Sequence, residues 1–129
     1  MSAQTEKKTF IEVQPEFPGG ISEMFKFLGK NIRYPANSRE KGIMGTLYVG
    51  FVIDSTGKIE NPIIKAQKLY RVKKKNIFSK PQVETVESDA DLAKECLRII
   101  SIMPVWKAGT QDGKPVRVAY TLPIKFSID

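Results

Sequence analysis

The chain has 129 residues, one cysteine and no histidine, and 21 Lys and Arg against 14 Asp and Glu give it a net charge of +7. This length fits one domain that buries a core without cross-links. A single cysteine excludes an internal disulfide, and without histidine the usual zinc sites and the Ser-His-Asp and Cys-His catalytic groups are absent. We therefore expect no enzyme, and no catalytic residue, metal or cofactor.

The first ten residues are polar, and we expect residues 1–10 to form a flexible tail before a single domain at 11–129. The start has no continuous apolar core, so it predicts neither a signal peptide nor a membrane anchor. No stretch approaches the roughly 18 apolar residues of a spanning helix. If the natural protein is exported, its export segment is missing from this chain. Phe10–Val13 predicts a short strand, which Pro15 ends.

Two helices are predicted next. Apolar residues recur at helical spacing from Ile21 to Ile32, after a Pro-Gly-Gly turn, and Gly20 or Ser22 is expected to cap this helix. Proline is favoured at a first helical position, so the sequence predicts a second, short helix over 35–41 that ends at Gly42.

A strand hairpin follows. Residues 46–53 are almost all apolar, β-branched or aromatic, which is typical of a central strand covered on both faces. Residues 54–57 are a turn signal, with Asp first and Gly last. Residues 59–69 predict the returning strand, and Pro62 favours an edge position or a bulge within it.

Residues 69–87 look like a basic and acidic insertion. The stretch 65–80 carries seven lysines and arginines and no acid, whereas acidic residues follow at 84–91. Because like charges repel, we expect a solvated extension of the hairpin plus a loop. Ser88 to Asp91 then fits a capping box for a helix over 89–103.

The last segment has the clearest pattern. Apolar residues alternate with mostly polar ones over 116–128, which predicts a strand with one face packed on the core. Pro123 again favours an edge or a bulge. The predicted fold class is α+β, with two main helices on one face of a three-stranded sheet. If strand 46–53 is central, the strand order is second, first, third, and 116–128 is an exposed edge.

An edge strand exposes unpaired N–H and C=O groups, which a protein must either protect or use. One interpretation is β-augmentation, in which a partner peptide adds a further strand. The other is that Pro123, Lys125 and Arg117 only block aggregation. We interpret Cys96 as a buried, inert thiol. Trp106 can be an anchor for a partner or a rigid plug that closes the core, and the plug is favoured.

Six stretches in order, covering about residues 12–128, resemble the C-terminal domain of TonB-type energy transducers in the form common in Bacteroidetes-like bacteria. They are Pro15-Glu16-Phe17-Pro18-Gly19-Gly20, Phe27-Leu28 with Asn31-Ile32-Arg33-Tyr34-Pro35, Gly42-Ile43-Met44-Gly45-Thr46, Phe51-Val52-Ile53-Asp54 with Gly57-Lys58-Ile59, Met103-Pro104-Val105-Trp106-Lys107, and Gly113-Lys114-Pro115-Val116-Arg117-Val118 running to Leu122-Pro123-Ile124-Lys125-Phe126.

The resemblance implies a periplasmic domain that binds the TonB-box peptide of an outer-membrane transporter as a strand beside its last strand. It implies an inner-membrane motor complex that acts through an anchor and a spacer. The loop at Tyr34 and Pro35 would lie near the transporter. The implied partner-binding residues are Val116, Arg117, Val118, Ala119, Tyr120, Thr121, Leu122, Lys125, Tyr34 and Pro35. A Val118→Pro substitution is expected to remove a donor from this strand.

The chain has neither the anchoring helix nor the proline-rich spacer of a complete transducer, so we expect an excised domain or a stand-alone relative of a protein anchored to the inner membrane. Two alternatives stay open. The edge strands of two copies can pair, which gives a dimer. The basic stretch 65–80 can bind an anionic surface, although we expect no nucleic acid as partner.

Overall fold

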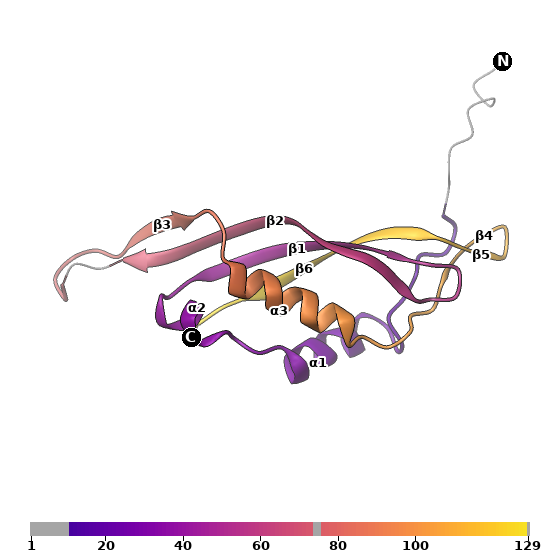
Figure 1. The fold of residues 1–129 in the computed structure, drawn as a ribbon, viewed down its shortest axis with the longest axis horizontal. Coiled ribbons are helices and arrows are strands. Elements are labelled where there is room, and N and C mark those ends of the chain that lie inside the picture. The colour runs from indigo at the N-terminus through magenta and orange to yellow at the C-terminus, as the bar shows by residue number, and fades with distance from the viewer. Residues whose placement is uncertain (1–10, 74–75, 129) are drawn as a thin grey trace, which may run out of the picture.

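The computed structural model describes residues 11–73 and 76–128, and these residues form three helices and six strands (Figure 1). The tail expected at residues 1–10 lies outside them. In chain order the elements are α1 (Ile21–Asn31), α2 (Ala36–Glu40), β1 (Met44–Ile53), β2 (Ile59–Lys73), β3 (Gln82–Val86), α3 (Ala90–Ser101), β4 (Gly109–Gln111), β5 (Lys114–Val116) and β6 (Val118–Phe126).

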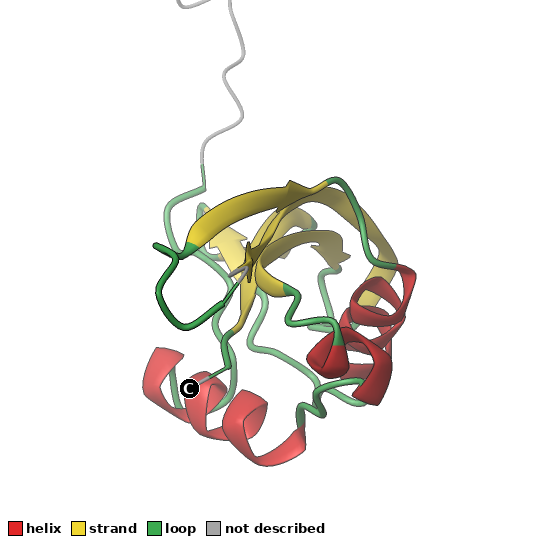
Figure 2. Cartoon of the chain, turned by 90° about the vertical axis from the view of Figure 1, so that its left-hand side faces the viewer, coloured by secondary structure: helices red, strands yellow, loops and turns green. Residues whose placement is uncertain are grey.

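The main sheet has four strands in the order β3-β2-β1-β6, and each neighbouring pair is antiparallel. Helices α1 and α3 lie on one face of this curved sheet (Figure 2). The α+β class and the order β2-β1-β6 were predicted correctly, as was the short helix α2. The predicted three-stranded sheet with two main helices was incomplete. The main sheet has a fourth strand, β3, the strands β4 and β5 form a separate hairpin, and α2 is a third helix.

The fourth strand comes from the segment predicted as an insertion. Strand β2 runs beyond Leu69 to Lys73, in agreement with the expected extension of the hairpin. The returning strand β3 was not expected, and it pairs with β2 from Leu69 opposite Val86 to Lys73 opposite Gln82. Glu84 explains this pairing, because its carboxylate bonds both Arg71, at 2.5 Å, and Lys73, at 3.2 Å. The acidic run thus neutralises part of the basic run. The two strands project from the body of the domain as an arm (Figure 1).

The hairpin of β1 and β2 follows the prediction. Gly57 donates its N–H to Asp54, which closes the expected turn. The register of β1 with β2 shifts between Gly50 opposite Ile63 and Val52 opposite Glu60, so β2 is bulged where it contains Pro62. This is the bulge that the missing N–H of proline favours.

The predicted last strand, 116–128, is two strands. Lys114–Val116 forms β5, which pairs with β4, and β6 begins only at Val118. Arg117 lies at the break, where its guanidinium bonds the Glu60 carboxylate at 2.5 Å. Alternation continued through the break, so the sequence pattern did not reveal it.

Helix starts also differ in part from expectation. Asp89, not Ser88, caps α3, because the Asp89 carboxylate accepts the N–H of Leu92 at 2.9 Å. At α1 the expectation holds for Gly20, which is the N-cap residue, and not for Ser22; no side chain bonds the first turn. Of the strand predicted at Phe10–Val13, Phe10 lies outside the described residues and Val13 forms a single bridge to Thr110.

The core lies between the sheet and α1 and α3. It is built from the inward face of β1, from β6 and from α3, and its least exposed members include Leu47, Val49, Ile53, Leu92, Cys96 and Ile99.

Candidate partner-binding edge of the sheet

Strand β6 forms one edge of the main sheet. Its nine residues pair with β1 from Val118 opposite Ile53 to Phe126 opposite Gly45. Within residues 11–73 and 76–128, no other segment pairs with β6, so its outer side is free there. The N-terminal segment instead bridges Lys107 and Thr110. A free flank of this kind can accept a further strand.

The direction of the β6 backbone groups follows from the turn between β1 and β2. Asp54 donates its N–H to the carbonyl oxygen of Lys58 at 2.8 Å, so its amide points toward β2. Successive residues of a strand turn their backbone groups to opposite sides, which directs the amide of Ile53 toward β6. Ile53 pairs with Val118, and the register continues without a shift. The residues whose backbone groups face outward are therefore Ala119, Thr121, Pro123 and Lys125.

Pro123 supports this assignment independently. A proline within a ladder is tolerated where its nitrogen faces away from the neighbouring strand, and the β1–β6 register passes through Pro123 unbroken. The outward donors are thus the N–H groups of Ala119, Thr121 and Lys125. Val118 faces β1, so a Val118→Pro substitution would damage the sheet itself and would not remove an outward donor, contrary to our expectation from the sequence.

The side chains of the predicted binding residues divide between the two faces. Leu122 is buried in the core, and Val118 and Tyr120 are half-buried on the helix face. Ala119, Thr121 and Lys125 are exposed on the opposite, open face. Leu122 therefore has no side chain to offer a partner, whereas Ala119 and Thr121 offer both backbone and side chain.

A pocket of about 650 Å³ lies on the helix face at the first half of β6. Its apolar walls come from the N-terminal segment, the start of α1, the loop after α3 and β6: Phe17, Ile21, Met24, Trp106 and Tyr120. The Tyr120 ring packs on Trp106, with centroids 5.1 Å apart, and on Phe51, at 5.6 Å. The pocket is therefore next to the outward donors of Ala119 and Thr121.

Trp106 is held by the turn between β1 and β2. The backbone N–H of Trp106 donates to the Gly57 carbonyl oxygen at 2.9 Å, and the indole ring stands edge-on to the Phe17 ring. Gly57 has φ +90°, and a Cβ there would lie 1.9 Å from the Trp106 carbonyl oxygen, so only glycine fits. The indole Nε1 is buried and has no hydrogen-bond partner in the part of the chain that the structure describes. Ring contacts hold this side chain in the pocket wall.

The Tyr34-Pro35 loop lies at the other end of β6. The Tyr34 ring is edge-on to Phe126, with centroids 5.4 Å apart, and its hydroxyl donates to the Ile43 carbonyl. Burial raises the pKa of Tyr34, and the Asp89 charge adds to this against the opposing effect of Arg39. The structure thus brings Tyr34 to the edge strand, but not to the pocket.

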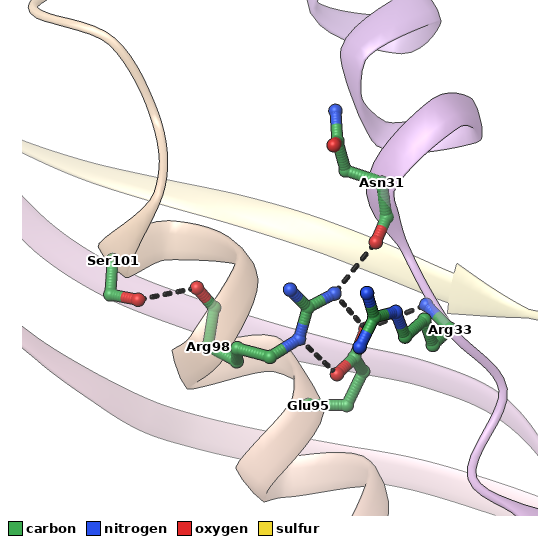
Figure 3. Close-up of polar contacts among 5 residues, drawn as sticks. All are labelled: Asn31, Arg33, Glu95, Arg98 and Ser101. Carbon is green, nitrogen blue, oxygen red and sulfur yellow. Dashed lines mark hydrogen bonds and ion pairs between the residues drawn. The ribbon is translucent and has the colours of Figure 1, made fainter.

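A polar cluster fixes the chain just before this loop (Figure 3). The Glu95 carboxylate on α3 accepts the backbone N–H of Arg33 at 2.6 Å and two bonds from the Arg98 guanidinium. Arg98 in turn donates to the Asn31 carbonyl at 2.6 Å. This cluster ties the end of α1 to α3 and so positions Tyr34.

Val116 and Arg117, both predicted to bind the partner, lie before β6. Val116 pairs with Gly109 in the small hairpin, and Arg117 is occupied by Glu60. Ile21 and Phe17, which line the pocket, were not among the predicted binding residues. Ile21 was assigned to the apolar face of α1, but it is 63% exposed at the start of that helix, and no signal in the sequence indicated this.

The described residues contain no group of three or more Cys, Asp and Glu side chains that could hold a metal ion. Burial, and next the Glu95 charge, raises the pKa of the Cys96 thiol to about 12, which keeps it protonated. None of the helices described is long and apolar enough to cross a bilayer.

Comparisons with protein-family models, with curated proteins and with solved structures gave no match.

Proposed function

We propose that this domain binds an extended peptide as an added strand along β6, as the C-terminal domain of a TonB-type energy transducer does with the TonB box of an outer-membrane transporter. The observation that carries the proposal is the coincidence of two features at one place. Outward donors at Ala119 and Thr121 adjoin an open, mostly apolar pocket walled by Tyr120 and Trp106.

Strand addition explains why both features are needed. Backbone bonds to the edge supply affinity but no selectivity, because every peptide has the same backbone. Alternate side chains of an added strand point to the helix face, which brings them toward the pocket walled by Tyr120 and Trp106, called the Tyr120 pocket below. An apolar side chain of the partner that enters this pocket would select the peptide. A periplasmic location and a transporter as partner belong to the same proposal and rest on the six ordered motifs.

The test is Thr121→Pro, which removes one outward donor and places a ring on the free flank. Proline is expected to be tolerated there, because Pro123 has the same orientation two residues on. Thr121→Val keeps the N–H and is the matched control. Loss of one backbone bond should weaken binding of a labelled TonB-box peptide by about tenfold, measured by fluorescence anisotropy.

The outcome is decisive only in a folded protein, so circular dichroism and the free energy of unfolding accompany each variant. Equal affinities of Thr121→Pro and Thr121→Val would refute strand addition at β6. Self-association along the same edge is the competing use of these groups. Sedimentation equilibrium would reveal it as a dimer that the peptide dissociates.

A further inference from the structure

The tip of the β2–β3 arm is a tight turn with an unusual composition. The Asn76 carbonyl accepts the N–H of Ser79 at 3.1 Å, and the Asn76 side chain accepts the N–H of Phe78 at 2.8 Å. The two central turn residues are Ile77 and Phe78, which are 80% and 89% exposed. Glycine, proline, asparagine and aspartate normally occupy such positions. The turn therefore holds two large apolar side chains in water at the end of a projecting arm (Figure 1).

The arm behind the tip is amphipathic. One face carries the ionic cluster of Arg71, Lys73 and Glu84. The other face carries Val72 opposite Val83, which are 49% and 71% exposed. An apolar strip thus leads along the arm toward the turn.

The charge of this region favours an anionic partner. The sequence from residue 65 to residue 80 contains no Asp or Glu. Lys80 is exposed and forms no ion pair among the described residues, and Glu84 balances only one of the two cations that it contacts. A cationic flank with an apolar end matches the interface of an anionic bilayer, where lysine stays at the headgroups and apolar side chains enter the acyl region.

We propose that the arm binds anionic phospholipid membranes by inserting Ile77 and Phe78, with Lys80 and Lys73 at the headgroup level. A narrow convex tip suits a bilayer better than a protein partner, since stable protein interfaces need about 800 Å² on each side. The arm begins at Leu69, which lies opposite Gly45 at the end of β6 remote from the Tyr120 pocket. Lipid binding and peptide binding can therefore occur together.

The probe is Phe78→Trp, which places a tryptophan at the tip. The chain contains one other tryptophan, Trp106, which is 3% exposed and gives a constant buried background. With vesicles of equal parts phosphatidylcholine and phosphatidylglycerol, the emission should shift to shorter wavelength, and brominated acyl chains should quench it. Vesicles of phosphatidylcholine alone should produce neither effect, and salt should weaken binding.

The double substitution Ile77→Ser with Phe78→Ser should lower vesicle affinity at least about tenfold, as judged by co-sedimentation. Ile63→Ser is the matched control, since Ile63 is an exposed apolar residue of β2 outside the arm and should leave binding unchanged. Vesicle binding without acyl-chain quenching would overturn insertion. Binding to heparin or DNA that the double substitution weakens equally would instead indicate a polyanion or protein site.

Discussion

Single residues fix the relative positions of the helices. Glu95 is 8% exposed, yet it remains charged. Burial alone would raise its pKa, but the hydrogen bonds from Arg98 and from the Arg33 N–H outweigh burial and lower the pKa below its ordinary value of 4.5. A carboxyl group with a lowered pKa stabilises the fold above its unfolded pKa, and this contribution is lost as pH falls through the folded pKa.

Glu95→Gln should therefore lower the free energy of unfolding by about 1.5–3 kcal/mol at pH 7, because a charged acceptor is lost. The difference from the unsubstituted protein should narrow when pH falls below 4.5, the ordinary pKa. Urea unfolding at the two pH values measures this. Glu40→Gln, on the exposed surface of α2, is the control, and a difference independent of pH would rule out this role of the charge.

Some features of single residues could be predicted from the sequence, and others could not. The alternation over the last segment and the apolar face around Cys96 were readable, because each follows from a local period. The partners of Glu95 were not readable, since the Arg33 N–H lies 62 residues away in sequence. The cap at Asp89 was not predicted for a similar reason, because one of its partners is distant in sequence. Its carboxylate also accepts the hydroxyl of Ser38, 51 residues away, at 3.0 Å.

At the scale of elements, the edge strand shows what a pattern specifies. The alternation of apolar and polar residues predicted which side chains of β6 face the core, because only one face of the strand is apolar. It did not predict which alternate amides face outward, since that depends on the pairing with β1 and on the turn at Asp54. The predicted site therefore included Leu122, whose side chain is in the core, and Val118, whose backbone faces β1.

Pro123→Thr should extend the row of outward donors by one. If strand addition at β6 is correct, a further backbone bond should tighten peptide binding by about two- to tenfold. The same change removes a feature that protects the edge, so self-association should also increase. Anisotropy and sedimentation measure the two effects. An affinity that is unchanged would mean that the bound peptide does not extend as far as residue 123.

At the scale of the whole molecule, the order β2-β1-β6 was predictable because the most apolar strand must be central. Strand β3 was not, since a run of lysines resembles a solvated loop until the distant Glu84 is placed beside it. The free edge at β6 was predicted from the sequence, but the pocket beside it was not. The pocket assembles from the N-terminal segment, α1, the Trp106 loop and β6, which only the complete fold brings together.

We expect the core to unfold locally as one unit, and the labelling rate of the Cys96 thiol can measure how often this occurs. The Cys96 side chain is fully buried between α3 and the sheet, so a thiol reagent should reach it only when α3 leaves the sheet. Gly57→Ala should raise the labelling rate at least about tenfold, because a Cβ there collides with Trp106.

Gly113→Ala is the matched control. Gly113 also has a positive φ, of 74°, but a Cβ there meets nothing within 4 Å. Gly113→Ala should raise the labelling rate of Cys96 less than Gly57→Ala does. The difference between the two variants then separates the effect of the collision from that of the backbone strain. Equal rates would show that the contact between Gly57 and Trp106 does not support the core.

Pro123 in β6 and Pro62 in β2 have a consequence for behaviour at high concentration. Pro123 interrupts the donors of β6, and Pro62 does so on the part of β2 that β3 leaves uncovered. Copies stacking side by side into an endless ribbon would need both flanks uninterrupted. The chain can thus leave a short stretch of β6 unpaired and still resist growth into fibrils.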